Sequence, residues 1–250
     1  MPINIVRSVT VQFIAVAIIS FLLILGAEKF EAGNRVNDIY YHQYPSDSMQ
    51  QTIDSSFLQK YPLQSIFYIH VEPPMIDIIR GVVVQFWNHE SGRLSKFLDE
   101  RLYFVWAMFF GFTVGLVFLW VRKSTSSTVF SVAVASCWLL NPSAIYLSTL
   151  LDGTLLSSLL ITWLLYEVWL VWKGEGAHLR LAIATILLFC TRTIFQWYFI
   201  PIVIVALLLL RLDRRRLAAV GLFLVLVVGA YCSKQYFLYG TLSTTTMAAE

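Results

Sequence analysis

Charged residues are scarce in this chain of 250 residues, since Asp, Glu, Lys and Arg make up 13% of it. Hydrophobic residues make up 58% of the chain, and the mean hydropathy is +0.71. An average soluble domain is about a quarter charged, so this chain has too little polar surface to cover itself in water. The net charge of +3 does not indicate a nucleic-acid partner, because the basic residues gather in short loops. We therefore expect an all-α integral membrane protein.

Several motifs that carry chemistry in other proteins are missing. The three cysteines, Cys137, Cys190 and Cys232, all lie in apolar runs, so they predict no disulfide framework. The sequence contains no glycine-rich phosphate loop, Cys/His metal pattern or internal repeat. It also lacks an N-glycosylation acceptor, since proline occupies the excluded position of Asn141-Pro142-Ser143. Because the Cys/His pattern is absent, the sequence predicts no metal site.

Apolar runs recur along most of the chain, and about 20 apolar residues cross a bilayer as a helix. We expect residues 1–250 to form a single membrane domain with about seven spans. The fifth run is short, so its boundary with the sixth is the least defined. The expected spans are residues 9–26, 102–121, 128–144, 155–172, 179–191, 194–210 and 217–232.

Basic residues in the short loops predict the orientation of these spans, because such residues are retained on the cytoplasmic side. If the seven spans alternate in direction, these basic residues all fall on one side of the membrane, together with the N-terminus. They are Arg7, Arg122, Lys123, Lys173, Arg180, Arg211, Arg214, Arg215 and Arg216. The loop 27–101 and the C-terminal stretch then lie outside the cytoplasm. We expect an uncleaved first span and a bacterial inner membrane. Glu167, inside the fourth span, is expected to pair with a neighbour or to reach the interface.

The extracytoplasmic loop 27–101 is long enough to carry its own structure. In residues 46–60, Met49, Ile53 and Phe57 recur every fourth position, which predicts one amphipathic helix. A second amphipathic helix is expected to begin at Pro73-Pro74, since proline suits the first helical turn. Its narrow polar face holds Asp77, Arg80, Gln85 and Asn88, and so lopsided a helix is typical of the membrane interface.

Three strings in this chain resemble segments of the membrane glycosyltransferases with the GT-C fold, in particular relatives of the dolichyl-phosphate-mannose protein mannosyltransferase group. SIFYIHVEPPMIDIIRGVVV, residues 65–84, is similar to their His-x-x-Pro-Pro segment. LFCTRTIFQWYF, residues 188–199, resembles their Thr-Arg segment at a helix junction. KQYFLYGTLSTTT, residues 234–246, is similar to the Lys-x-x-x-x-x-Gly-x-x-Ser/Thr run after the seventh span.

The resemblance implies an inverting glycosyltransferase that moves a sugar from a polyprenyl-phosphate donor to an extracytoplasmic glycan, lipid or protein acceptor. A loop carboxylate would act as the base. Asp47 fits that position best and Asp38 is the second choice. The simpler interpretation of Asp47 is a helix cap, because Gln50 follows three residues later, and that of Asp38 is a solvated turn. The resemblance leaves a divalent metal cofactor open.

Four further residues are candidates for binding the donor phosphate: Arg192, Lys234, His70 and Glu72. Arg192 lies between apolar runs, where an ionisable residue is costly and tends to be functional, and its planar guanidinium suits phosphate. Snorkelling to the interface is the alternative for Arg192, and an ordinary helix-end lysine is the alternative for Lys234. His70 and Glu72 precede the expected helix at Pro73-Pro74, whose N-terminus favours anions. They can equally cap a turn.

Two other classes of function stay open at this point. The double-acid pattern of many GT-C members is absent, and the separated Asp38, Asp47 and Asp54 stand in that part of the chain. A catalytically inactive subunit or scaffold of a membrane glycan-assembly complex, working with a partner subunit, is therefore the main alternative. A transporter fits less well, because transporters break their helices at the bilayer midplane. Here the breaks lie towards the outer surface.

Overall fold

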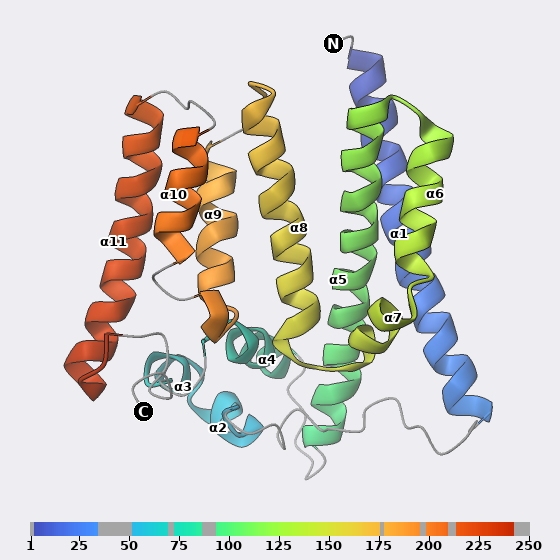
Figure 1. Ribbon diagram of the computed structural model, residues 1–250. Helices are drawn as coiled ribbons and strands as arrows, with labels where there is room; N and C mark the ends of the chain where they lie inside the picture. The colour runs from blue at the N-terminus through green and yellow to red at the C-terminus, as the bar shows by residue number, and fades with distance from the viewer. Residues whose placement is uncertain are drawn as a thin grey trace. The chain divides into compact units, whose positions relative to one another are not determined.

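The computed structural model describes residues 3–34, 52–69, 73–86, 94–175, 178–195, 199–209 and 214–242. Regular structure in these ranges is helical, and none of them contains a strand, which confirms the prediction of an all-α chain (Figure 1). The helices group into two compact units. Residues 1–48 and 92–162 form unit 1, and residues 49–91 and 163–250 form unit 2.

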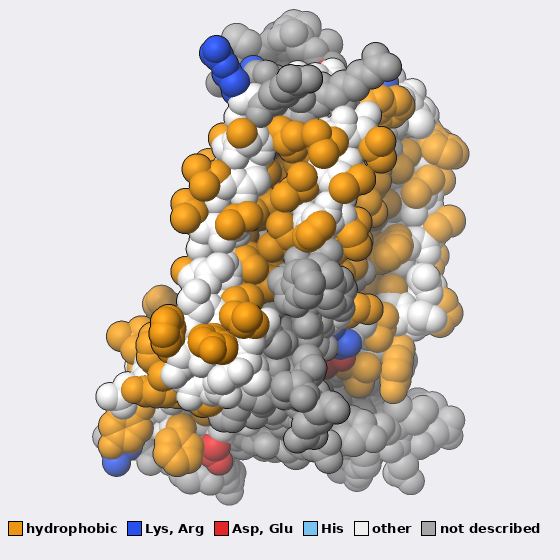
Figure 2. Space-filling model, turned by 60° about the vertical axis from the view of Figure 1, so that its left-hand side comes forward, with side chains coloured by type: hydrophobic (Ala, Val, Ile, Leu, Met, Phe, Trp, Pro, Cys, Tyr) orange, Lys and Arg blue, Asp and Glu red, His pale blue; other side chains and the backbone are white. Residues whose placement is uncertain are grey.

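Four described helices are long and apolar enough to cross a membrane: Val9–Ala27, Leu98–Thr125, Gly153–Trp172 and Arg215–Tyr239. A fifth candidate is a broken span, Thr128–Leu139 followed by Pro142–Ser148, whose two parts meet at 60°. Figure 2 shows hydrophobic side chains over most of the described surface in that view, which suits lipid better than water. Within the described residues, four or five helices are therefore long and apolar enough to be spans, as expected of a multi-span membrane protein.

Two of the seven expected spans appear as shorter helices. The run 179–191 forms α9 (His178–Phe189), and the run 194–210 forms α10 (Phe199–Leu209). With 12 and 11 residues, they are about 18 and 16 Å long at 1.5 Å per residue. The hydrocarbon core is about 30 Å thick, so each of these helices is shorter than a core of ordinary thickness.

In unit 1, α1 (Ile3–Asn34) packs closely against α5 (Leu94–Thr125). Gly111 and Gly115 face Ala17 of α1, and they form the G-x-x-x-G spacing that lets membrane helices approach closely. A Cβ on Gly111 would stand 2.5 Å from the Ala17 carbonyl oxygen. Contact between these two helices therefore depends on the missing side chain at Gly111.

Gly111→Ala is expected to lower the free energy of unfolding by about 1–3 kcal/mol, the usual cost of overpacking. The backbone of α1 has to move, because the clashing atom is a carbonyl oxygen and not a flexible side chain. Thermal unfolding in detergent measures the effect. Gly26→Ala is the matched control, since no atom lies within 4 Å of the added Cβ there. Equal stability of the two variants would contradict close packing at Gly111.

The remaining helices of unit 1 are α6 (Thr128–Leu139), α7 (Pro142–Thr149) and the first part of α8 (Gly153–Trp172). Asn141 separates α6 from α7, and its side chain accepts a hydrogen bond from the amide of Ser143 at 2.9 Å. Pro142 occupies the first turn of α7, where its missing amide is no loss. The expected span 128–144 ended at this same Asn-Pro pair, and the structure confirms a break there.

Unit 2 contains α2 (Ser55–Lys60), α3 (Pro62–Phe67), α4 (Met75–Phe86), the end of α8, α9, the short 3-10 helix η3 (Thr193–Phe195), α10 and α11 (Arg214–Tyr239). Helices α9, α10 and α11 lie side by side, and the three short helices α2, α3 and α4 gather at one end of them (Figure 1). This end of unit 2 carries most of the residues that the sequence marked as functional.

The expected helix over residues 46–60 is present over part of its described range, as α2. Residues 52–54 are not helical, and α2 begins at Ser55 with Asp54 as its N-cap. Phe57, from the expected apolar stripe, is 58% exposed, whereas the neighbouring Leu58 is fully buried. Asp54 starts the helix because its carboxylate accepts a hydrogen bond from the Ser56 amide at 2.7 Å.

The expected helix after Pro73-Pro74 is present as α4, but part of its expected polar face is buried, while Gln85 is exposed. Arg80 is completely buried and Asp77 nearly so, and their side chains form an ion pair of 2.6 Å. Arg80 also donates to the Ile53 carbonyl at 2.6 Å, and Asp77 accepts from the Ile53 amide at 3.3 Å. Asp77 and Arg80 of α4 therefore bind the backbone of Ile53, just before α2 begins.

Candidate functional site

Helices α9 and α11 run parallel, which brings their C-terminal ends together. Near their starts, Arg216 lies 3.4 Å from the ring of His178. Near their ends, the rings of Phe189 and Tyr231 pack edge to face with centroids 5.8 Å apart. Helices α9 and α11 can be parallel because α10, which lies between them in the chain, runs in the opposite direction (Figure 1). Residues that follow Phe189 and Tyr231 consequently emerge at the same end of unit 2.

Lys234 lies in the last turns of α11 and binds the end of α3. Its ammonium donates to the carbonyl of Phe67 at 2.8 Å and lies 3.5 Å from that of Ile69. These carbonyls lie at or just beyond the C-terminal end of α3, where carbonyl groups lack helical partners and attract cations. The ammonium also lies over the rings of Tyr231 and Phe67, at 4.8 and 5.5 Å from their centroids. Lys234 is thus a cation held at a partly aromatic surface.

Two more side chains of α11 bind the same stretch of backbone. The Gln235 amide, 1% exposed, donates to the Ile69 carbonyl at 3.1 Å. The Tyr239 hydroxyl donates to the Tyr68 carbonyl at 2.6 Å. Sequence reasoning missed these residues, although Tyr231, Gln235 and Tyr239 recur every fourth position and so share one face of α11.

The start of α4 is attached to the end of α9. The Met75 amide donates to the Cys190 carbonyl at 2.9 Å. Each group lies at a helix end and lacks a partner in its own helix, so this bond satisfies both. Arg192 follows two residues after Cys190, half-buried, and its carbonyl accepts from the Phe195 amide at the turn into η3. Arg192 therefore lies close in sequence to the point where α4 begins.

Together these contacts place described residues of all three strings at one end of unit 2. Residues up to Ile69 are held by α11, and Met75 is held by the end of α9. Arg192 and Lys234 are the two predicted phosphate ligands that the structure describes, and they belong to this end. The other four candidates, Asp38, Asp47, His70 and Glu72, lie outside the described residues.

Both carboxylates that the structure describes in the α2–α4 segment already have partners. Hydrogen bonds from the hydroxyl and then the amide of Ser56 lower the pKa of Asp54, which caps α2. Asp77 forms the buried ion pair with Arg80. A general base needs a carboxylate that is accessible to the substrate and has a pKa near the working pH. Neither of these two aspartates meets that condition.

Glu167 of α8 lies towards the other end of unit 2 and is 2% exposed. It accepts from Arg180 at 3.0 Å and from the Trp163 indole at 3.2 Å. This confirms the expectation that Glu167 pairs with a neighbour. Within the described part of the chain, no group of three or more His, Cys, Asp or Glu side chains is arranged to hold a metal ion.

These features define an α-helical multi-span membrane protein with a polar, cation-bearing surface at one end of a helical unit. Comparisons with protein-family models, with curated proteins and with solved structures found no match.

Proposed function

We propose that this protein is a GT-C-type glycosyltransferase that moves a sugar, with inversion, from a polyprenyl-phosphate donor to an extracytoplasmic glycan, lipid or protein acceptor. The observation that carries the proposal is the arrival of Arg192 and Lys234 at the same end of unit 2, where α9 and α11 bind the segments on either side of residues 70–72. These segments are far apart in the chain.

The proposed chemistry needs cations where the phosphate leaves. Negative charge grows on the phosphate as the bond to the sugar breaks, and fixed donors that meet this charge lower the barrier. Arg192 offers a planar guanidinium for two phosphate oxygens. Lys234 offers a third N–H beyond the two directed to Phe67 and Ile69. His70 and Glu72 belong to the same string, and we retain them as candidate ligands.

In this proposal the base is Asp47, with Asp38 as the second choice. The base removes the proton of the acceptor hydroxyl while the sugar is transferred from the donor phosphate. Asp54 and Asp77 are set aside because each already has a structural partner. A divalent metal, if the enzyme uses one, would help to neutralise the leaving phosphate.

We also propose that the chain crosses the membrane seven times, with α9 and α10 as short spans, and that Arg192 and Lys234 face away from the cytoplasm. Support comes from the basic residues at the opposite end of unit 2, namely Lys173, Arg180, Arg215 and Arg216, which the positive-inside rule assigns to the cytoplasm. A short span is tolerated when the bilayer thins around it. A bacterial inner membrane is the proposed location.

A transfer assay tests the proposal. The purified full chain is given radiolabelled polyprenyl-phosphate sugars and a membrane extract as the source of acceptor, beside Asp47→Asn and Asp38→Asn. We expect transfer from one of the donors, and its loss in Asp47→Asn with the fold retained. Unchanged transfer in Asp47→Asn would remove that residue as the base, and loss in Asp38→Asn alone would assign the role to Asp38.

The second candidate is a catalytically inactive subunit of a membrane glycan-assembly complex. One observation favours it: the described carboxylates of the α2–α4 segment, Asp54 and Asp77, are both used to hold structure. The assay above separates the two candidates. A folded protein that transfers no sugar from any donor, but that co-purifies with another membrane glycosyltransferase and is required for its activity, would establish the subunit.

A further inference from the structure

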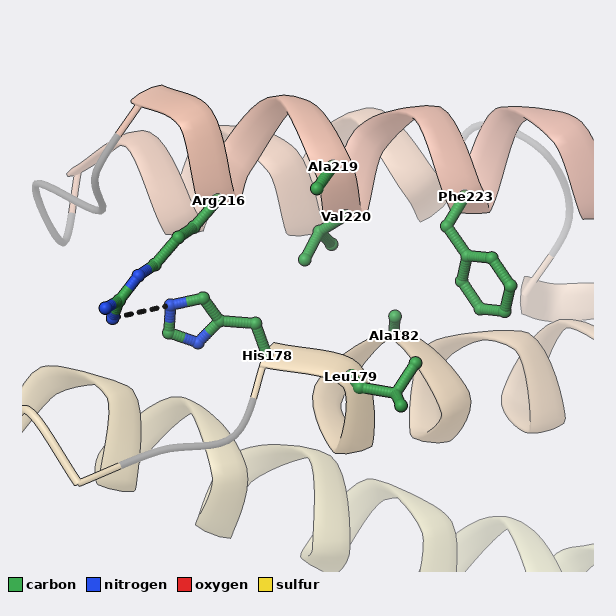
Figure 3. Close-up of a pocket in the computed structure, with 7 residues that line it drawn as sticks. All are labelled: His178, Leu179, Ala182, Arg216, Ala219, Val220 and Phe223. Atoms are coloured by element: carbon green, nitrogen blue, oxygen red, sulfur yellow. Dashed lines mark hydrogen bonds between the residues drawn. The ribbon is translucent and has the colours of Figure 1, made fainter.

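A groove of about 400 Å³ lies between the first turns of α9 and α11, at the opposite end of these helices from Arg192 and Lys234 (Figure 3). Its volume is within the range of ordinary ligand sites, which is about 300–1,000 Å³. The groove belongs entirely to unit 2. The proposed transfer reaction involves none of its residues.

The groove is polar at one end and apolar along the rest of its length. At the polar end, the Arg216 guanidinium and the His178 ring stand 3.4 Å apart (Figure 3). The apolar part is lined by Leu179 and Ala182 of α9 and by Val220 and Phe223 of α11. From Arg216 to Phe223 the helix rises about 10 Å, which is enough to pass from a headgroup region into hydrocarbon.

Arg216 has unused hydrogen-bonding capacity. Guanidinium carries five N–H donors, and within the described residues this exposed side chain hydrogen-bonds only to the His178 ring. His178 Nδ1 is buried and has no hydrogen-bond partner in the part of the chain that the structure describes. An acceptor with several negatively charged oxygens would satisfy N–H groups of Arg216; the buried His178 Nδ1 lies on the far side of the ring from Arg216 (Figure 3).

Neighbouring charges also favour an anion at this end of the groove. Arg215 stands next to Arg216 in the first turn of α11. The one carboxylate known to contact the start of α9, Glu167, is already paired with Arg180 and does not bind Arg216. Arg216 at the polar end therefore forms no ion pair with a described carboxylate, and the nearest acid in sequence to His178, the exposed Glu175, does not pair with it.

We propose that this groove binds an anionic phospholipid. Its phosphate is bound by Arg216, which lies beside the His178 ring, and one acyl chain lies along Leu179, Ala182, Val220 and Phe223. Basic pockets between membrane helices are the usual sites for such headgroups, and the first turns of an apolar span set the depth at which a headgroup meets hydrocarbon. The lipid fits the two-part character of the groove, whereas a free phosphate would leave the apolar part empty.

The test is native mass spectrometry of the purified full chain in detergent, titrated with phosphatidylglycerol and, separately, with phosphatidylcholine. One basic residue near the membrane surface contributes about 1 kcal/mol to binding of an anionic lipid, so we expect Arg216→Ala to raise the Kd for phosphatidylglycerol about fivefold. Ala219→Phe fills the groove without changing charge, and we expect a comparable loss. Arg215→Ala is the matched control, because it removes a neighbouring charge that does not line the groove.

Four results would overturn the proposal. Equal weakening by Arg215→Ala and Arg216→Ala would mean general attraction to a basic surface. Unchanged affinity in Ala219→Phe would mean that no chain occupies the groove. Equal binding of phosphatidylcholine would show that headgroup charge is not recognised, and displacement of the lipid by millimolar inorganic phosphate would assign the site to free phosphate. The assay does not depend on sugar transfer, so it can fail or succeed independently of the proposed enzyme.

Discussion

Arg192→Ala is expected to lower kcat for sugar transfer by about 10²–10³-fold, the usual cost of removing one fixed donor from developing negative charge. The residue lies two positions after Cys190, whose carbonyl binds the first amide of α4. The residue therefore belongs to the end of unit 2 where the leaving phosphate is proposed to bind. Since the charge grows in the transition state, kcat should fall more than KM rises. Steady-state kinetics with the donor identified in the transfer assay measures the split.

Two comparison variants make this result specific. Arg192→Lys keeps the charge but loses the planar fork, so we expect an intermediate rate. Lys173→Ala removes one positive charge from the far end of unit 2, where Lys173 lies beside the Trp172 ring, and should transfer at the normal rate. If Arg192→Ala retained full kcat and KM in a folded protein, Arg192 would be a snorkelling residue without a role in the reaction.

Arg80→Met is expected to destabilise the α2–α4 segment by about 3–5 kcal/mol, because it leaves the Asp77 carboxylate buried and without its cation. The same change removes the donor to the Ile53 carbonyl. Native-state hydrogen exchange of residues 52–60 reports the free energy of opening of this segment directly. A neighbouring basic residue, Lys60, is exposed, and Lys60→Ala should leave that free energy unchanged within about 0.5 kcal/mol.

The double variant Asp77→Leu/Arg80→Met separates buried charge from lost hydrogen bonds. Replacing both members of a buried pair by apolar residues is often close to neutral. Here the amide and the carbonyl of Ile53 would lose their partners, at a cost of about 1–3 kcal/mol for unsatisfied groups. We therefore expect partial recovery relative to Arg80→Met. If Arg80→Met were as stable as the unmodified protein, the Asp77–Arg80 pair would not hold α4 to the chain before α2.

Much of the helical structure was predictable because it depends on local properties of the chain. The runs 155–172 and 217–232 predicted α8 and α11 to within a few residues at most ends, although α11 continues to Tyr239. Pro73-Pro74 marked the start of α4, and Asn141-Pro142 marked the bend between α6 and α7. Each signal is carried by neighbouring residues: an apolar run, a missing amide or a capping side chain.

The expected helix over residues 46–60 does not include residues 52–54, because contacts distant in sequence outweigh the periodicity there. An apolar residue at every fourth position suggested a helix through Ile53, but that residue donates its amide to Asp77 and its carbonyl accepts from Arg80. Asp54 then caps a shorter helix that begins at Ser55. The burial of Asp77 and Arg80 in α4 was not predictable for the same reason. Both residues bind the backbone of Ile53, which lies 24 and 27 positions earlier in the chain.

The sequence by itself determined that this is an all-α membrane protein, where its long apolar helices lie and where several of them end. These properties depend on composition and on residues a few positions apart, because a helix in the hydrocarbon core needs a continuous apolar run. Only the tertiary structure decided that α9 and α11 are parallel neighbours, that Lys234 binds the end of α3 and that Asp77 and Arg80 turn inward. Those choices depend on which helix surfaces meet and on which buried polar groups find partners, and hydropathy along a chain carries no information about either.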